Sequence, residues 1–356
     1  MTTTGVPNIP DAASLWSSAD RALEMARVVL GSIDAPVGLT PKEIIWRKNK
    51  ARLYHYTRSG PATRRTPIFL VLPLINRAYI LDLRPGASFV EFLLSEGFDV
   101  FLIDWGVPGD EDRALDVTTL VTRYLPRAAK AIRRATGADQ MTVLGYCIGG
   151  ALATCFAALH PEVVRNLVLL TAPLDFAEAG QFGRMTARGV FPIDLLTETF
   201  PTVPGQVPDV GSKLLNPTAN YVGTYRNLWQ RLGDPAFDVS AWQAMYRWVN
   251  DSVPFAGAAF RQWIVEFYQD NRLTRDMLEM DGRPVRLASI RCPVLNIAAS
   301  RDQIAPRETT SAVTKLVGSR DASEIVVDGG HVGIVVGRSA SQNLWPKVAS
   351  WLDAHD

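Results

Sequence analysis

The chain has 356 residues, of which 47% are hydrophobic, enough for one large α/β domain with an insertion or for two domains. Its 37 Lys and Arg residues balance 36 Asp and Glu residues, and the resulting net charge of +1 indicates no nucleic-acid partner. The three cysteines, Cys147, Cys155 and Cys292, have no CxxC spacing, so they predict neither a disulfide framework nor a zinc site and suit a reducing cytoplasm.

Residues 1–39 are expected to form an N-terminal helical segment. Leu23, Ala26 and Leu30 recur at helical spacing, which places them on one apolar face used for packing or docking. The N-terminus lacks the basic and apolar regions of a signal peptide, so we expect no export. The run Thr40-Pro41-Lys42-Glu43 has the form of a capping box with proline at the first helical position, and it predicts that a short helix begins there.

Apolar strands then alternate with helices along the chain. Strands are expected at 67–74, at 99–104, from 141, and at 166–170, 293–299 and 324–327, and helices at 88–96, from Asp116 to Gly137, and up to His160. Residues 140–161 carry no charge and are long enough for a membrane span, but their glycines and strand-like start predict a strand, a turn and a helix instead. The alternation predicts a mostly parallel, doubly wound α/β sheet.

A nucleophile elbow is predicted at residues 141–150, where a short apolar run meets a Gly-x-Cys-x-Gly box and a helix of small residues. Gly145 and Gly149 leave room for a strand to turn sharply into a helix, so that Cys147 projects its sulfur. A thiolate is a strong nucleophile at neutral pH and forms thioesters readily, which suits acyl transfer.

Two backbone N–H groups and two side chains complete the predicted site. The N–H of Ile148, at the start of the elbow helix, and that of Ile75, in the loop after the first core strand, are candidates for an oxyanion hole. Asp302 directly follows a strand, which is the position of a triad acid, and His331 lies in a glycine-lined loop after the last strand. The order Cys147, Asp302, His331 is the nucleophile, acid and histidine order of the α/β-hydrolase fold.

An inserted cap is expected at residues 173–287, between core segments 40–172 and 288–356. Prolines interrupt its first part, and its second part is rich in aromatic residues at helical spacing. These aromatic residues, expected either to fill the interior of the cap or to shape an apolar tunnel over the nucleophile, are Trp248, Phe255, Trp263, Phe267 and Tyr268.

From about Thr40 onward the chain resembles the polyhydroxyalkanoate synthases, in particular the short synthases of classes III and IV. The resemblance rests on runs 40–43, 73–77, 79–85, 102–106, 145–150 and 260–273. It implies that Cys147, Asp302 and His331 are catalytic and that the enzyme polymerises (R)-3-hydroxyacyl groups from coenzyme A into an intracellular polyester. Coenzyme A thioester is then the substrate, and no cofactor or metal is expected.

The same resemblance implies partners and a location. The long N-terminal domain of other synthases is absent, which implies a separate helical partner subunit, and the family suggests a homodimer through the cap. The expected location is the cytoplasm, at the surface of polyester granules, with no transmembrane segment.

Two other functions remain open at this stage. A cysteine hydrolase, of the dienelactone hydrolase or thioesterase type, would share the triad but generally lacks so large an insertion. A non-catalytic granule-associated protein would not need an intact Cys147, Asp302 and His331. Release of coenzyme A together with insoluble polymer, rather than free hydroxyacid, separates these functions.

Overall fold

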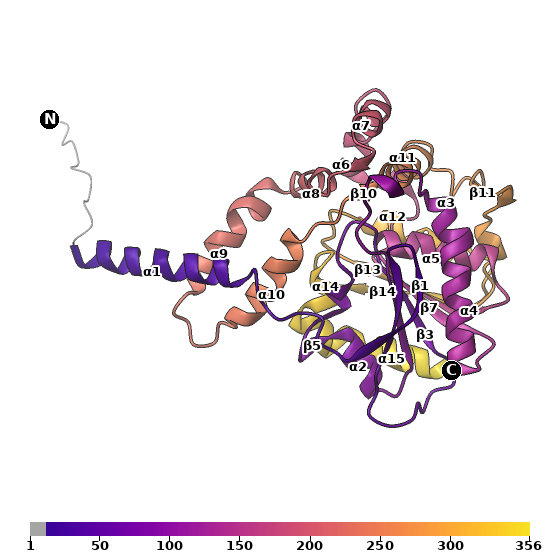
Figure 1. Ribbon diagram of the computed structural model, residues 1–356, viewed down its shortest axis with the longest axis horizontal. Helices are drawn as coiled ribbons and strands as arrows, with labels where there is room; N and C mark the ends of the chain where they lie inside the picture. Colours follow the sequence, from indigo (N-terminus) through magenta and orange to yellow (C-terminus); the bar gives the residue numbers. More distant parts are fainter. Residues whose placement is uncertain (1–11) are drawn as a thin grey trace.

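The computed structural model describes residues 12–356, with side chains described from residue 17, and residues 1–11 of the expected N-terminal segment lie outside the described residues. Its centre is an eight-stranded sheet in the order β1-β2-β6-β3-β7-β8-β13-β14 (Figure 1). The strands are β1 (Lys42–Lys48), β2 (Ala51–Tyr56), β3 (Ile68–Val71), β6 (Val100–Asp104), β7 (Met141–Tyr146), β8 (Val164–Leu170), β13 (Val294–Ala299) and β14 (Ala322–Val327). The strands from β6 to β14 in this order run parallel, and β2 and β1 extend one edge of the sheet in antiparallel pairs. The predicted mostly parallel, doubly wound sheet is confirmed.

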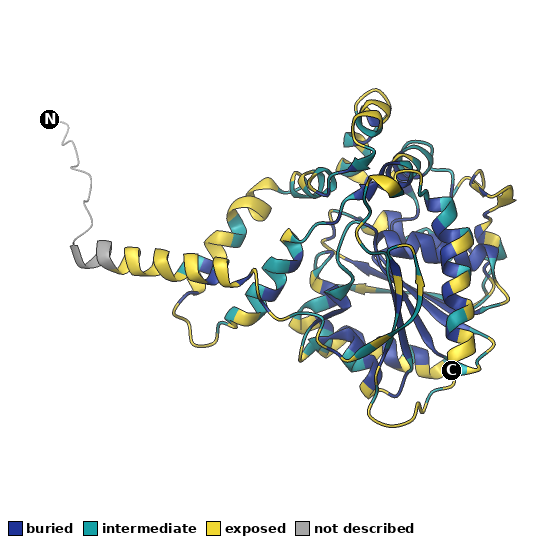
Figure 2. Cartoon of the chain, viewed as in Figure 1, coloured by how far each residue is buried: buried dark blue, intermediate teal, exposed yellow. Residues whose placement is uncertain are grey.

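Helices bury this sheet from both faces. Every residue of β3, β7 and β13 is buried (Figure 2), as expected of parallel strands that read as continuous apolar runs. Helices α4 and α5 lie on one side of the sheet, and α2 and α15 lie on the other side (Figure 1). The helices packed around the sheet are α2 (Phe89–Ser95), α3 (Val117–Thr119), α4 (Leu125–Thr136), α5 (Ile148–Leu159), α12 (Arg307–Ser311), α13 (Val313–Leu316), α14 (Gly333–Val336) and α15 (Trp345–Ala354).

Residues 173–287, expected to form the cap, add no strand to the eight-stranded sheet. Their helices are α6 (Gly180–Met185), α7 (Ile193–Thr199), α8 (Gln206–Lys213), α9 (Thr224–Arg231), α10 (Val239–Asn250) and α11 (Gly257–Gln262). Two small strand pairs accompany them, β9 (Thr202–Val203) with β10 (Phe255–Ala256) and β11 (Glu279–Met280) with β12 (Arg283–Pro284). Residues that follow β3, β7 and β14 line one cavity together with residues of these helices, so part of residues 173–287 lies over the carboxyl end of the sheet.

The helix predicted to begin at Thr40 is wrong. Lys42 starts strand β1, which pairs antiparallel with β2. The Thr40 hydroxyl does not cap a helix, because it donates a hydrogen bond to the buried carboxylate of Asp82, which also accepts one from the Ser88 hydroxyl. Pairing with β2 and the contact with Asp82 therefore outweigh the local capping pattern.

Helix α1 (Ala12–Gly31) extends away from the sheet and contacts α9 and α10 (Figure 1). Its contact with the rest of the chain centres on Val28, which is buried beside Leu228. Leu23 and Leu30, on the face predicted for packing or docking, are 60% and 65% exposed, so this face does not pack within the chain. Among the described residues, no helix combines the length and apolarity that crossing a membrane requires.

Candidate active site

Cys147 lies at the sharp turn between β7 and α5. Its backbone angles, φ 55° and ψ −128°, are ones that residues other than glycine rarely adopt. The Cys147 N–H donates a hydrogen bond of 2.9 Å to the Leu170 carbonyl on the neighbouring strand, which holds the turn against the sheet. The backbone therefore has the shape of the predicted nucleophile elbow.

Three glycines permit the close contacts of this turn. A Cβ on Gly149 would lie 2.2 Å from the carbonyl oxygen of Val71, and one on Gly145 would lie 2.4 Å from the Cα of Gly150. A Cβ on Gly150 would itself lie 2.3 Å from the Cβ of Ala172. These separations are far below van der Waals contact, so only glycine fits at each position. The sequence predicted the need for space at Gly145 and Gly149.

His331 and Asp302 form a buried pair beside the elbow. The Nδ1 of His331 lies 2.7 Å from the Oδ2 of Asp302, and both residues are less than a tenth exposed. The Oδ1 of Asp302 accepts hydrogen bonds of 2.9 Å from the backbone N–H groups of Ile304 and Ala305. Both oxygens of Asp302 are thus engaged, and the carboxylate holds the imidazole ring in one orientation.

Cys147 faces the same imidazole. Cys147 and His331 line the same cavity, and because Asp302 occupies Nδ1, the nitrogen of His331 that is left to act on the thiol is Nε2. Burial acts to lower the pKa of His331, but the neighbouring Asp302 and Cys147 raise it well above its ordinary value. The structure therefore brings together all three side chains predicted from the sequence, in the order Cys147, His331, Asp302.

The two predicted oxyanion donors, Ile148 and Ile75, line the cavity that holds Cys147. Ile148 is the first residue of α5, where a backbone N–H has no acceptor within the helix and the helix dipole favours negative charge. Ile75 follows β3, in the loop that also carries Asn76, and both residues line the same cavity.

The cavity has a volume of about 350 Å³ and is enclosed mainly by apolar side chains. Four of the five aromatic residues predicted for the cap line it, namely Trp248, Phe255, Trp263 and Tyr268. The fifth, Phe267, is completely buried within the protein instead. Cys147 itself is 7% exposed. The nucleophile therefore lies at a mainly apolar cavity with little of its own surface exposed.

The sequence reasoning missed polar residues of this cavity. Asp209 and Lys213 line it from helix α8 and form an ion pair of 2.8 Å. Their separation by one helical turn was the only signal in the sequence, and it is equally typical of exposed helices. Ser252 also lines the cavity and pairs with Asn76 across a short antiparallel bridge.

The remaining histidines and cysteines lie in other surroundings. His55 lies 2.7 Å from Asp99, and His355 lies 2.9 Å from Asp321. Cys155 is fully buried in helix α5, where burial raises the pKa of its thiol far above the ordinary value. Burial also raises the pKa of the Cys292 thiol, to about 11.

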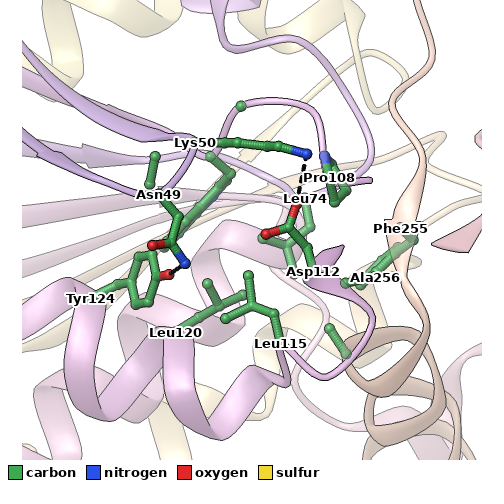
Figure 3. Close-up of a pocket in the computed structure, with 14 residues that line it drawn as sticks. Asn49, Lys50, Leu74, Pro108, Asp112, Leu115, Leu120, Tyr124, Phe255 and Ala256 are labelled. Carbon is green, nitrogen blue, oxygen red and sulfur yellow. Dashed lines mark hydrogen bonds and ion pairs between the residues drawn. The ribbon is translucent and has the colours of Figure 1, made fainter. Parts of the chain in front are cut away.

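A second, smaller cavity of about 40 Å³ lies between the β1–β2 turn and the cap (Figure 3). Its charged groups are already paired, because the Lys50 ammonium lies 2.8 Å from Asp112, and the Asn49 amide donates to the Tyr124 hydroxyl at 2.9 Å. Phe255 lines both this cavity and the one that holds Cys147. The smaller cavity thus adjoins the candidate site but contains no unpaired charge for chemistry.

Comparisons with known proteins place this arrangement in a family. Residues 85–337 match a family model described as the alpha/beta hydrolase fold, and residues 20–93 match one for the N-terminus of poly-beta-hydroxybutyrate polymerase (PhaC). The poly(3-hydroxyalkanoate) polymerase subunit PhaC of Haloferax mediterranei is 36% identical over 341 residues, which cover 96% of this chain and 68% of that protein. The subunit of the same name from Allochromatium vinosum is 36% identical over 318 residues, which cover 89% of each protein.

Solved structures agree on the fold. The monoacylglycerol lipase of Paleococcus ferrophilus matches 85% of this chain and 99% of its own with a TM-score of 0.54 at 16% identity. A putative lipase from Sulfolobus solfataricus matches 89% of this chain and 99% of its own with a TM-score of 0.54 at 15% identity. The chain therefore has the α/β-hydrolase fold and belongs to the family of poly(3-hydroxyalkanoate) polymerases, which are acyltransferases.

Proposed function

We propose that this chain polymerises (R)-3-hydroxyacyl-coenzyme A into polyhydroxyalkanoate, with release of coenzyme A, through a thioester on Cys147. The relatives' names supply the overall reaction. The observation that supports the covalent route is that His331, paired with Asp302, lines the same mainly apolar cavity as Cys147, which lies at a nucleophile elbow. No cofactor is needed in this scheme, because the coenzyme A thioester is itself the substrate.

Loading is the first half of the proposed cycle. The Nε2 of His331 takes the thiol proton of Cys147, and the sulfur attacks the carbonyl carbon of the substrate thioester. The negative oxygen of the tetrahedral intermediate accepts hydrogen bonds from the N–H groups of Ile148 and Ile75. The bond to the coenzyme A sulfur then breaks, and the leaving thiolate takes the proton back from His331.

Extension is the second half. The 3-hydroxyl oxygen of an incoming hydroxyacyl-coenzyme A attacks the acyl carbon held on Cys147, while His331 takes the hydroxyl proton. An ester bond forms, the thioester breaks, and Cys147 regains a proton from His331. The lengthened chain, now a coenzyme A thioester, transfers back to Cys147 and releases coenzyme A as in loading.

Water would convert this enzyme into a hydrolase, because it could attack the same thioester. We assign its exclusion to a cap subdomain, residues 173–287, over a core formed by residues 40–172 and 288–356. The apolar lining contributed by Trp248, Trp263 and Tyr268 supports this assignment.

We also propose that the protein works in the cytoplasm at the granule surface, as a homodimer through the cap and with a helical partner subunit. Apolar side chains left exposed on α1 and on the cap support such contacts. They include Leu23, Leu30, Val190, Leu195 and Val222, each more than half exposed.

The test follows the fate of the acyl group. The wild-type protein is incubated with (R)-3-hydroxybutyryl-coenzyme A, and free coenzyme A, insoluble polymer and free hydroxyacid are measured together, with mass spectrometry of the acylated cysteine. Coenzyme A release with polymer and an adduct on Cys147 is expected, and Cys147→Ala should abolish both, whereas Cys155→Ala should retain both. Coenzyme A release with free hydroxyacid alone would identify a hydrolase, and no release at all would identify a non-catalytic protein.

A further inference from the structure

Asp251 lies at the end of helix α10 in the cap, yet both of its carboxylate oxygens contact the loop that follows strand β3. Oδ1 accepts a hydrogen bond of 2.8 Å from the Nε of Arg77, with which it also forms an ion pair. Oδ2 accepts a hydrogen bond of 3.0 Å from the Tyr79 hydroxyl. Burial, together with the neighbouring Asp251 carboxylate, raises the pKa of Tyr79, so this hydroxyl keeps its proton and remains a donor.

Three further contacts join the same two segments. The indole N–H of Trp248 donates to the Arg77 carbonyl at 3.0 Å. The Val253 N–H donates to the Ile75 carbonyl at 3.1 Å, and Ser252 forms the antiparallel bridge with Asn76. Residues 248–253 and residues 75–79 therefore form one continuous hydrogen-bonded unit between the cap and the core.

This unit determines the position of a candidate oxyanion donor. The peptide segment that carries the Ile75 N–H is fixed on the core side, where the Trp105 indole donates to the Leu72 carbonyl at 2.9 Å. It is fixed on the cap side by the Val253 N–H at the Ile75 carbonyl. Between these points Pro73 restricts one backbone torsion, so few conformations remain for the Ile75 N–H.

The cap side of the unit is itself firmly seated. A Cβ on Gly205, at the start of α8, would lie 2.8 Å from the Val253 carbonyl oxygen, so the two backbones are in close contact. Trp248 is buried at 4% exposure. The side chains of Arg77 and Asp251 are more exposed, at 37% and 30%, but their ion pair is still partly shielded from water.

We propose that Asp251 is a positioning residue for acyl transfer: from the cap it holds, through Arg77 and Tyr79, the loop that places the Ile75 N–H in the oxyanion hole. The inference rests on the proposed function, since it concerns the tetrahedral intermediate formed at Cys147. It assigns Asp251 no contact with substrate. Its consequence is that the oxyanion hole is complete only while residues 248–253 of the cap are docked on the core.

The test uses one nucleophile and two electrophiles. Loading of Cys147 by (R)-3-hydroxybutyryl-coenzyme A passes through a tetrahedral oxyanion, whereas alkylation of Cys147 by iodoacetamide is a displacement at carbon that needs only the thiolate and access. Asp251→Asn should slow single-turnover loading by about 10–100-fold, because removing a whole oxyanion donor costs about 100–1,000-fold and displacing one costs less. The alkylation rate and the KM for substrate should change by less than about two-fold.

Matched variants separate positioning from general loosening of the cap. Asp194→Asn breaks a similar ion pair, to Arg261 at 2.7 Å, elsewhere on the cap and should leave loading unchanged. In an Arg77→Gln/Tyr79→Phe background, Asp251→Asn should add little further loss, because the residue acts through those two side chains. Parallel changes in loading and alkylation, or losses that add in the combined variant, would overturn the inference.

The outcomes also separate this inference from the proposed function. A wild-type protein that released coenzyme A without acylating Cys147 would refute both. A wild-type protein that loads Cys147 normally while Asp251→Asn loads it equally fast would refute the positioning role alone.

Discussion

Replacing Asp302 by asparagine should set the wrong tautomer on His331. Asparagine has one oxygen where aspartate has two, and the N–H groups of Ile304 and Ala305 both require an acceptor at the Oδ1 position. The single side-chain oxygen of the asparagine should therefore remain there, which turns the amide NH₂ toward the Nδ1 of His331. That NH₂ is a donor, so Nδ1 must become an acceptor and the ring proton must move to Nε2. His331 can then no longer take a proton at Nε2.

The size of the effect follows from counting these hydrogen bonds. Turning the amide the other way would leave the N–H groups of Ile304 and Ala305 without an acceptor and would restore only one hydrogen bond, to the Nδ1–H of His331. Each unsatisfied buried polar group costs about 1–3 kcal/mol. The unproductive orientation should thus be favoured by about 1–3 kcal/mol. The productive orientation is then populated at about one part in 5 to 150, so the tautomer alone costs about 5–150-fold, and loss of the negative charge beside the imidazolium brings the total in a comparable triad to about 10⁴-fold, equivalent to about 5.4 kcal/mol.

The two halves of the cycle should respond unequally. A thiol is partly ionised near neutral pH even without a base, whereas an alcohol is not. We therefore expect Asp302→Asn to slow extension by about 10⁴-fold and loading by about 10–100-fold. Single-turnover release of coenzyme A reports loading, and steady-state polymer formation reports extension.

Asp302→Ala is the decisive companion variant. It also removes the carboxylate, but it brings no amide to impose the wrong tautomer, so it should load and extend faster than Asp302→Asn. Thermal unfolding of both variants checks that the alanine variant, which leaves the N–H groups of Ile304 and Ala305 without their acceptor, is as well folded as the asparagine variant. An asparagine variant that is more active than the alanine variant, or that loses loading and extension equally, would refute the tautomer argument.

Three other predictions address the thiols, the elbow and the sheet edge. Iodoacetamide should alkylate Cys147 first and Cys155 last, because burial raises the pKa of the Cys155 thiol far above the usual range and that of Cys292 to about 11; peptide mapping of a time course checks the order, and early labelling of Cys155 would contradict it. Gly149→Ala should destabilise the fold by about 1–3 kcal/mol or more, since its Cβ would meet the Val71 carbonyl oxygen at 2.2 Å, whereas Gly223→Ala, with its nearest contact at 3.5 Å, should be neutral in the same urea titration. The hydrogen bond to Asp99 raises the pKa of His55 above 6.5 despite its partial burial, so its stabilising contribution should be fully present below about pH 6.5 and lost as the pH rises through the raised pKa; His55→Gln should remove this pH dependence from the free energy of unfolding, and an unchanged profile would contradict it.

The parts of the fold that could be predicted are those in which local sequence and final environment agree. The elbow could be predicted because Gly145 and Gly149 provide the space that the turn needs, and the atoms that need this space include ones only a few residues away. The strands at 67–74 and 293–299 read as apolar because both faces of each are covered. The roles of Asp302 and His331 stay predictions, although the structure places their side chains in contact with each other and His331 in the cavity that holds Cys147.

The parts that could not be predicted depend on partners far along the chain. The pattern at Thr40 is typical of a helix start. In the structure, however, Thr40 hydrogen-bonds to Asp82, and the residues that follow it pair with strand β2 at the edge of the sheet. The aromatic residues predicted at helical spacing in the second part of residues 173–287 are divided by strand β10, because Phe255 pairs with Val203. Asp251 reads as an ordinary polar residue at a helix end, and nothing near it in sequence reveals a contact with Arg77, 174 positions away.

The mainly apolar cavity around Cys147 has a volume of about 350 Å³, near the lower end for sites that hold a single small ligand. A polyester has no fixed length, so in the proposed cycle all but its newest units must leave this space, while the growing end returns to the sulfur after each addition. The length of the polymer is then limited by its exit from the cavity and not by the volume of the cavity. In that cycle each enzyme molecule would be bound covalently to its product whenever the chain is on Cys147, which would hold the protein at a granule for that time without any lipid anchor.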